Sequence, residues 1–320
     1  MISETTCAQL PKESHTLPPH GVFLAPMAGV NDPVFRRICK RLGADLTYTE
    51  MISAKGLSYN NTRTERMLSL DETESPVAVQ LFGKDPHTLA EQAQALEASH
   101  GADIALIDIN MGCPARKIAG KGEGAALMRD PELAAAILRA VVGAVKLPVT
   151  VKFRKGYELD ADDAVAFAQR AEQCGVAAVA VHGRTAQQFY HGRADRALIG
   201  RVRQAVTIPV IASGDVFTPD DIRAYFEEQG ADAVMVARGA QGNPWIFSAS
   251  EPTLEERVRI AWEHTEGLHG CQPQRLASMR KHVSWYFCGV SHAATIRRLA
   301  NDCVTLLDYQ ALFEQILAWR

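Results

Sequence analysis

The sequence predicts an eight-stranded β/α barrel followed by a small all-helical domain. Short apolar runs rich in β-branched residues recur about every 30 residues, and stretches with a 3.6-residue hydrophobic period separate them. This alternation is typical of parallel strands joined by crossover helices. The length of 320 residues suits one barrel of roughly 250 residues with an appendage.

Eight strands are expected, at residues 21–25, 45–49, 77–82, 104–109, 149–153, 178–181, 210–212 and 233–236. An open, doubly wound sheet typically has about six strands and a nucleotide-binding fingerprint after the first of them. Eight strand-helix units therefore favour a closed barrel.

The expected barrel helices cover residues 87–99, 131–145, 162–173, 194–205 and 218–229. Two of them begin at capping sequences, Asp130-Pro131 and Thr218-Pro219. Glycine closes several helical stretches, at Gly43, Gly101, Gly175 and Gly230. These signals support the same element boundaries as the hydrophobic period.

After residue 247 the alternation stops, and amphipathic helices are expected at 254–268, 275–288, 293–301 and 306–319 with no strand between them. The polar join at 248–252 marks the boundary. We therefore predict an N-terminal tail at 1–19, a barrel at 20–248 and a helical domain at 249–320.

Composition narrows the class of protein. The chain has no run near the ~18 apolar residues that a membrane helix needs, and charged residues interrupt residues 1–19, so a cytoplasmic location is expected. The seven cysteines are scattered without a C-x-x-C pair, which indicates reduced thiols and neither a disulfide framework nor a metal site. A net charge of −3 excludes a general polycation, so any RNA binding requires a local patch.

Polar side chains, with glycines and a few small or apolar residues, follow the expected strands at their C-terminal ends, where barrel enzymes place their active sites. These residues include Pro26, Met27, Ala28, Glu50, Gln80, Asn110, Cys113, Lys152, Arg154, His182, Arg184, Ser213, Gly214, Asp215, Ala237, Arg238 and Gly239. Their convergence on one mouth predicts a catalytic or binding site there.

The loops after the last two strands predict a phosphate site. Gly214 and Gly239 let backbone N–H groups approach an anion, and Arg238 adds a cation. Tight βα turns are the alternative explanation of such glycines. From neighbouring strand ends, Lys152 is placed to stabilise negative charge on a reduced flavin or to hold a substrate oxygen, and Gln80 to bond the pyrimidine edge of a flavin.

Cys113 is the candidate acid because it follows a strand end in a sharp Gly-Cys-Pro loop beside Arg116 and Lys117. A nucleophilic pair with His182 is an alternative without local sequence support. The glycines of 120–124 have the wrong spacing for a dinucleotide loop, and the sequence contains no P-loop.

The segment Ile107-Asp108-Ile109-Asn110-Met111-Gly112-Cys113-Pro114 resembles the hallmark segment of the tRNA-dihydrouridine synthases. Further motifs follow in the family's order: Pro26-Met27-Ala28-Gly29, Val79-Gln80-Leu81-Phe82-Gly83, Val151-Lys152, Val181-His182-Gly183-Arg184-Thr185, and Arg238-Gly239 with Gly242-Asn243-Pro244-Trp245. Met279-Arg280-Lys281-His282 and Trp285-Tyr286 resemble the bacterial type B branch. The resemblance extends from Gly21 to about Asn301.

The resemblance implies a flavoprotein oxidoreductase that uses FMN, reduced by NADPH, to reduce the C5–C6 double bond of particular uridines in tRNA. It implies that Cys113 protonates C5 and that Asn110 and Arg184 position the base. The implied FMN residues are Pro26, Met27, Ala28, Gln80, Lys152, His182, Ser213, Gly214, Asp215, Ala237 and Arg238. Ser213 and Ala237 depart from the family, which often has Asn and Gly there; both positions are expected to contribute backbone contacts.

RNA contacts are expected from Arg116, Lys117, Lys121, Arg154, Lys155, Arg280, Lys281, Arg297 and Arg298, because RNA affinity depends on cations that face phosphates. For Arg297 and Arg298, a solvated helix face is an equal alternative. The expected partners are tRNA, with the D-loop as the region modified, and NADPH; the expected state is a monomer. Two other functions stay open: reduction of a free pyrimidine, as in dihydroorotate dehydrogenases, and RNA binding without catalysis. Ribosomal RNA also stays open as a substrate.

Overall fold

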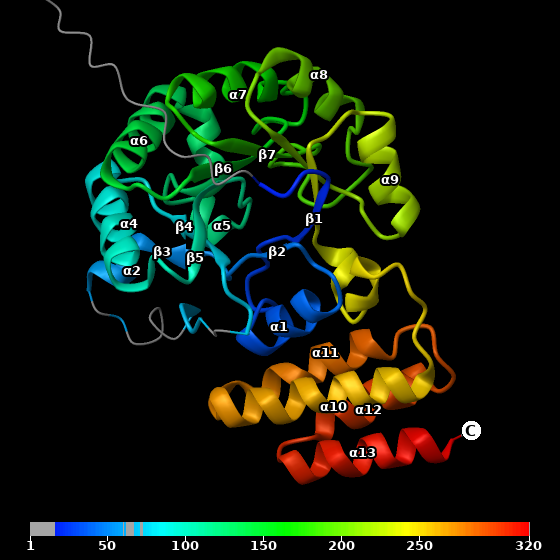
Figure 1. Ribbon diagram of the computed structural model, residues 1–320. Coiled ribbons are helices and arrows are strands. Elements are labelled where there is room, and N and C mark those ends of the chain that lie inside the picture. The colour runs from blue at the N-terminus through cyan, green and yellow to red at the C-terminus, as the bar shows by residue number, and fades with distance from the viewer. Residues whose placement is uncertain (1–16, 60, 62–66, 71–72, 320) are drawn as a thin grey trace, which may run out of the picture.

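In a computed structural model of the chain, a ring of parallel strands is surrounded by helices, with a group of further helices at one side (Figure 1). The structure describes residues 17–59, 61, 67–70 and 73–319. Most of the predicted N-terminal tail, residues 1–16, lies outside the described residues.

The strands are β1 (Gly21–Leu24), β2 (Leu46–Thr47), β3 (Ile52–Ser53), β4 (Val77–Phe82), β5 (Ile104–Met111), β6 (Val149–Arg154), β7 (Ala178–His182), β8 (Val210–Ser213) and β9 (Ala233–Val236). They form one sheet in the order β2-β1-β9-β8-β7-β6-β5-β4-β3, with every pair parallel. The predicted barrel is confirmed. Where one second strand was expected, the structure has two short ones.

These two short strands close the barrel. β2 pairs with β1 and β3 pairs with β4, and both belong to the same stretch of chain. Between them Tyr48 bridges Ala78 in parallel fashion, and the Thr49 N–H donates to the Ala78 carbonyl at 2.9 Å. β2 and β3 are therefore two parts of one bent segment, residues 46–53, which lies between β1 and β4 in the barrel.

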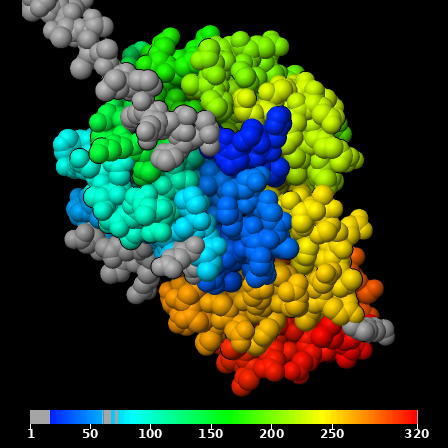
Figure 2. All heavy atoms as spheres, viewed as in Figure 1, coloured from blue at the N-terminus to red at the C-terminus, as the bar shows by residue number. Residues whose placement is uncertain are grey.

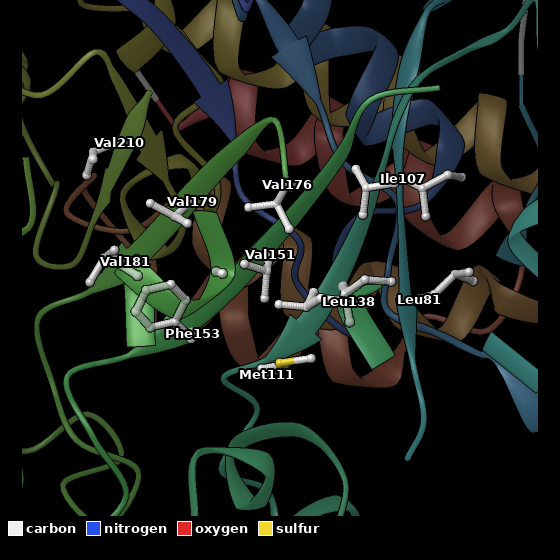
Figure 3. Close-up of a cluster of buried hydrophobic side chains, with 14 of the residues drawn as sticks. Leu81, Ile107, Met111, Leu138, Val151, Phe153, Val176, Val179, Val181 and Val210 are labelled. Carbon is white, nitrogen blue, oxygen red and sulfur yellow. The ribbon is translucent and has the colours of Figure 1, made fainter. Parts of the chain in front are cut away.

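Alternation along each strand divides the core into two layers. Inside the ring, small and medium side chains such as Ala178, Ala180 and Ile211 pack with Phe23 and Met235. The intervening residues face outward and pack beneath the helices. Figure 3 labels this outer layer: Leu81, Ile107, Met111, Val151, Phe153, Val176, Val179, Val181 and Val210 gather with Leu138 of the helix that covers β5 and β6.

The barrel helices are α1 (Pro33–Arg41), α2 (Ala54–Ser58), α4 (Pro86–His100), α5 (Arg116–Ala119), α6 (Pro131–Ala144), α7 (Ala164–Gln173), α8 (Ala197–Ala205) and α9 (Pro219–Glu227), with 3-10 turns η1 (Gly124–Arg129), η2 (Arg238–Ala240) and η3 (Pro244–Phe247). Both predicted caps are confirmed: Asp130 accepts from the Leu133 N–H, and Thr218 forms a capping box with Asp221. No helix within the described residues is long and apolar enough to span a membrane.

The C-terminal helices are α10 (Leu254–Cys271), α11 (Met279–Tyr286), α12 (Ala293–Asp302) and α13 (Leu306–Ala318), with the 3-10 turn η4 (Pro273–Ser278) before α11. The single helix expected at 275–288 is thus divided into η4 and α11. These helices share a core with Val34 and Ile38 of α1, and Figure 2 shows them packed directly against the barrel. The domain boundary at 248/249 stays a prediction.

A buried polar group joins α1 to the C-terminal helices. Asp32, the N-cap of α1, accepts from the Phe35 N–H at 3.0 Å, and its carboxylate lies 3.0 and 3.1 Å from Nε2 of His264 on α10. His264 Nδ1 lies 3.0 Å from the Tyr286 hydroxyl on α11. Burial acts to raise the Asp32 pKa, but the attraction and hydrogen bonding of His264 outweigh it and hold that pKa well below its usual range. The carboxylate therefore fixes both helices to the barrel.

Candidate active site at the barrel mouth

The inward-facing side chains become polar toward the C-terminal ends of the strands. On β6, Val151 and Phe153 lie in the outer core, so Lys152 between them faces the interior of the ring. In the same register position, Asn110 of β5 is paired with Lys152. Gln80 is paired with Asp108 one layer below. The structure thus brings together several predicted site residues that lie far apart in the sequence.

Four side chains on β4, β5 and β6 form a continuous hydrogen-bonded chain. Asp108 accepts from the Thr150 hydroxyl and from Gln80 Nε2, each at 2.6 Å. Gln80 Oε1 then accepts from Asn110 Nδ2 at 2.8 Å. Burial raises the pKa of Asp108 to about 6, although the Gln80 and Thr150 hydrogen bonds and the charge of Lys152 oppose it, so the carboxyl group is mainly ionised at neutral pH.

The Cys113 loop is held directly above this chain. Asn110 Oδ1 accepts from the Cys113 N–H at 3.0 Å and from the Gly112 N–H at 3.2 Å. The Cys113 carbonyl accepts from the Ala125 N–H at 3.0 Å, which ties the loop to η1. The thiol is half-buried, so Cys113 is neither a core cysteine nor a freely solvated one.

Lys152 is a cation without a direct ion pair within the described residues. Among the described residues, its ammonium group has no hydrogen-bond acceptor or ion-pair partner. Burial and the neighbouring charge of Arg154 lower its pKa to about 8, while Asp108 and Cys113 act in the opposite direction. An unpaired cation in a cavity mouth is suited to a ligand that carries or develops negative charge.

His182 is neutral and has a defined tautomer. Burial, followed by the charges of Arg154 and other nearby cations, holds the pKa of the imidazole well below its ordinary value. Its Nδ1 accepts from the Arg184 N–H at 3.1 Å, so the ring proton lies on Nε2. That nitrogen lies 3.6 Å from where a Cβ on Gly214 would stand, which makes it a donor beside the predicted phosphate loop.

The two predicted phosphate loops require glycine. Gly214 has a φ of 125°, and a Cβ there would lie 2.8 Å from the Cβ of Ala194. A Cβ on Gly239 would lie 2.1 Å from the Val216 carbonyl oxygen. The Tyr225 hydroxyl supports the first loop by donating to the Gly214 carbonyl at 2.6 Å. Close backbone packing therefore shapes this side of the mouth.

Arg184 and Asp215 are paired with each other. Both terminal nitrogens of Arg184 donate to the Asp215 carboxylate at 2.7 Å, and Arg238 adds a third contact at 3.1 Å. Arg184 also donates to the carbonyls of His191 and Gly192, so four of its five N–H groups are occupied. In this arrangement Arg184 holds the loop after β7, and one N–H of its Nη1 remains beyond these bonds.

The predicted RNA-contacting cations occupy several different environments. Arg116, Lys117 and Lys121 are exposed beside the Cys113 loop. Arg154 is 4% exposed, and its Nε and Nη1 donate to the carbonyls of Gly112, Thr185 and Phe189, so its contact with RNA stays a prediction. Lys155 is half-buried in an ion pair with Asp195 at 2.9 Å.

The remaining cations lie on the C-terminal helices. Arg280, Lys281 and Arg297 line a surface hollow of ≈ 320 Å³ between η4, α11 and α12, whereas Arg298 is exposed outside it. Arg280 donates to the Cys303 carbonyl at 3.0 Å and 3.1 Å. Lys281 reaches the barrel, where it donates to the Gly29 carbonyl. The hollow therefore adjoins the loop that follows β1.

That loop carries Pro26, Met27 and Ala28, the FMN residues expected after the first strand. Met27 is partly buried, and its sulfur lies 3.7 Å from Gln241 Nε2. Ser213 is buried at the end of β8, and Ala237 lies directly after β9. All three regions meet at the same end of the barrel because the strands are parallel.

Two residues of the site lacked a predicted role. Asp108 stands two positions before Asn110 on the same inward face, so strand alternation was the signal that could have identified it. Glu50 accepts from the Gly29 N–H and, at 2.7 Å, from Arg275 of η4. Its partner in the C-terminal region could not be found from the sequence.

The arrangement can be compared with known proteins. A family model described as dihydrouridine synthase matches residues 23–318. The tRNA-dihydrouridine synthase B of Xanthomonas axonopodis pv. citri is 42% identical over 297 residues, which cover 89% of each chain. The protein of the same name from Pseudomonas aeruginosa is 42% identical over 296 residues, which cover 88% of each chain.

Among solved structures, histamine dehydrogenase from Rhizobium sp. 4-9 superposes with a TM-score of 0.53 at 12% identity, covering 80% of this chain and 50% of that one. This likeness supports the barrel fold alone. The family model covers nearly the whole described barrel and the C-terminal helices, and the two relatives agree with it. The chain belongs to the dihydrouridine synthase family.

Proposed function

We propose that this protein reduces the C5–C6 double bond of particular uridines in tRNA, with FMN as the bound cofactor and NADPH as the reductant. The observation that carries the proposal is the placement of the half-buried Cys113 thiol and the unpaired Lys152 cation in one barrel mouth, in a chain of this family. A proton donor and a site for negative charge are the two requirements of adding hydride and proton to a uracil ring.

The mouth fits FMN. Gly214 and Gly239 allow the close packing of the loops after β8 and β9, Nε2 of His182 offers a donor beside Gly214, and Lys152 offers a cation without a direct ion pair in the described part of the chain. The residues proposed to hold the cofactor are Pro26, Met27, Ala28, Gln80, Lys152, His182, Ser213, Gly214, Asp215, Ala237 and Arg238. When bound and reduced, FMN supplies hydride.

The protein's own residues complete the reaction. As uracil C6 receives hydride, C5 takes the proton of the Cys113 thiol, and the resulting thiolate regains a proton from solvent. Asn110 has one N–H beyond its bond to Gln80, which is proposed to donate to a carbonyl oxygen of the base. The pyrimidine ring gains one hydride and one proton, so the dihydrouridine product is neutral.

A uridine within folded RNA reaches this mouth only after it leaves its stack. We propose that the C-terminal helices hold the surrounding RNA through the hollow lined by Arg280, Lys281 and Arg297, and that Arg116, Lys117 and Lys121 contact phosphates near the mouth. Arg298, an exposed cation on the same helix as Arg297, is also proposed to contact RNA.

The test is dihydrouridine formation in unmodified tRNA by the FMN-loaded protein with NADPH, with each product mapped to its nucleotide. Free uridine, free orotate and ribosomal RNA serve as parallel substrates. Product at defined tRNA positions, and none from the free pyrimidines, is the expected result. Turnover of a free pyrimidine alone, or stable RNA binding with no product from any substrate, would contradict the proposal.

A further inference from the structure

Asp108 is a fully buried carboxylate that the reaction outlined above does not use. It lies on the inward face of β5, one layer below Asn110, and its side chain is 0% exposed. Both of its oxygens are occupied, one by Thr150 and the other by Gln80. Lys152 lies on the adjacent strand, paired in register with Asn110.

The direction of the hydrogen-bonded chain above Asp108 is fixed at both ends. At the upper end, the N–H groups of Gly112 and Cys113 can only donate, so Asn110 must present its oxygen to them. At the lower end an ionised Asp108 can only accept, so Gln80 must present its amide nitrogen to it. Gln80 Oε1 is then left to accept from Asn110 Nδ2, as observed at 2.8 Å.

This polarity determines what Asn110 offers to a substrate. Its oxygen already accepts two backbone N–H groups, and one amide hydrogen is bound to Gln80. The group that remains is one N–H donor. A donor at this position suits a ring carbonyl of a pyrimidine and disfavours an exocyclic amino group, which would place two donors face to face.

We propose that Asp108 is a positioning residue that sets the direction of the Gln80–Asn110 chain, so that Asn110 meets the substrate as a donor, and whose negative charge keeps Lys152 protonated. The proposal rests on the proposed function for the identity of the substrate. The contact geometry and the charge on Lys152 are properties of the protein itself.

Several charges act on this pair of residues. Lys152 is influenced by Arg154 on its own strand, by Asp108 and Cys113 from β5 and its loop, and it acts in turn on His182 of β7. Burial raises the pKa of Asp108, and the charge of Lys152 acts to lower it. Burial raises the pKa of the Tyr48 phenol, which lies between β2 and β3, well above its ordinary value, and the charge of Asp108 adds to this effect. With the pKa of Lys152 lowered to about 8, its charge is lost as pH rises through the weakly alkaline range.

Two substitutions separate the two roles of Asp108. In Asp108→Asn the new amide oxygen can still accept from Gln80, and its nitrogen can donate to the Thr150 hydroxyl, so the chain keeps its direction but loses the charge. Asp108→Leu removes both the acceptor and the charge while keeping the branching of the side chain. Asp103→Asn is the matched control, because Asp103 precedes the same strand at the opposite end and is hydrogen-bonded to Ser75.

The first readout is the pH dependence of Lys152 acetylation by acetic anhydride, followed by mass spectrometry of its peptide in the purified protein. The midpoint is expected to fall by about one pH unit in Asp108→Asn relative to the wild type, and to be unchanged in Asp103→Asn. An unchanged midpoint in Asp108→Asn would overturn the charge role. This readout does not depend on which substrate the enzyme uses.

The second readout is kcat and KM for dihydrouridine formation across pH. Below the Lys152 midpoint, Asp108→Asn is expected to stay within about threefold of wild-type kcat/KM, while Asp108→Leu loses about tenfold or more, since its orphaned amides no longer align Asn110. Wild-type kcat/KM in a folded, flavin-bearing Asp108→Leu protein would overturn the positioning role. If the wild type makes no dihydrouridine, the proposed function fails, whereas the acetylation midpoints still decide the charge role.

Discussion

At the scale of single residues, the mouth combines the Cys113 thiol with the Lys152 cation and the neutral imidazole of His182, and the charge states of the last two follow from their surroundings. Lys152 is charged at neutral pH yet has no direct ion pair among the described residues, and His182 is kept neutral by burial among cations. A bound anion would satisfy both: the Lys152 ammonium by attraction, and Nε2 of His182 by accepting its hydrogen bond. Lys152 and His182 are therefore better suited to binding an anion than to transferring a proton.

Replacing Lys152 by Ala is predicted to lower the fraction of protein that retains FMN and to slow flavin reduction by NADPH about tenfold or more, because a cation facing developing negative charge is lost. Lys155→Ala is the control, since Lys155 is three residues away but paired with Asp195. Flavin absorbance after gel filtration and stopped-flow reduction give both values. Unchanged content and rate in Lys152→Ala would exclude its contact with the cofactor.

At the scale of elements, the interface between barrel and C-terminal helices is built from close backbone contacts and a buried charge. Gly242, after η2, has a φ of 67°, and a Cβ there would lie 2.1 Å from the backbone carbon of Trp285 on α11. Asp32 links α1 to α10 through His264, and Glu50 links the segment between β2 and β3 to Arg275 of η4. The loop after β1 is thereby positioned by helices from the other end of the chain.

Gly242→Ala is predicted to reduce the free energy of unfolding by about 2 kcal/mol or more, because the added methyl group meets backbone and the positive φ is strained. Gly143→Ala lies within α6 with open space around its Cβ position, so it should raise stability by roughly 0.5–1 kcal/mol. Urea unfolding of both variants measures the contrast. Equal effects would show that Gly242 does not pack against α11 in solution.

His264→Ala is predicted to cost about 3–5 kcal/mol of unfolding free energy, because Asp32 would remain buried without its main partner. His282 packs against His264, but its ring nitrogens have no hydrogen-bond partner within the described residues. Replacing His282 by Leu removes those unsatisfied groups and is expected to be neutral or mildly stabilising. If His282→Leu proved as destabilising as His264→Ala, its nitrogens would have a partner in solution.

The elements were predictable where their signals are local, and the site only in part. Strand alternation located β4 to β9 to within about two residues, because each strand is buried and bounded by turns. It could not show that residues 46–53 bend into β2 and β3, or that the helix expected at 275–288 is divided after Ser278 into η4 and α11, since packing decides both. The hydrogen bonds from Gln80 to Asp108 and from Arg184 to Asp215 depend on which strands are neighbours and on their register.

At the scale of the whole molecule, the net charge of −3 coexists with a cationic hollow on the C-terminal helices next to the mouth. Such a local patch can bind one region of an RNA without coating it. The hollow and the mouth are connected through the contact of Lys281 with Gly29. The proposed RNA-binding hollow therefore adjoins the proposed active site.

Arg297→Ala is predicted to weaken tRNA binding and to reduce the slope of log K against log salt concentration by about 0.7–0.9, because one phosphate contact is lost. Arg298→Ala is the comparison on the same helix; Arg298 lies outside the hollow and 3.9 Å from Asp302, so its effect should be smaller. Filter binding at several salt concentrations measures both slopes. Equal slopes for wild type and Arg297→Ala would place the RNA elsewhere.

The most direct measurement compares wild type with Cys113→Ala, both loaded with FMN, for dihydrouridine formed in unmodified tRNA with NADPH. We predict that Cys113→Ala retains FMN, which NADPH still reduces, but forms product at least about 100-fold more slowly, because general acid catalysis contributes that much. Retained product formation in Cys113→Ala would contradict the role of the thiol as proton donor. Loss of flavin reduction in this variant would show instead that Cys113 acts before the uridine is reached.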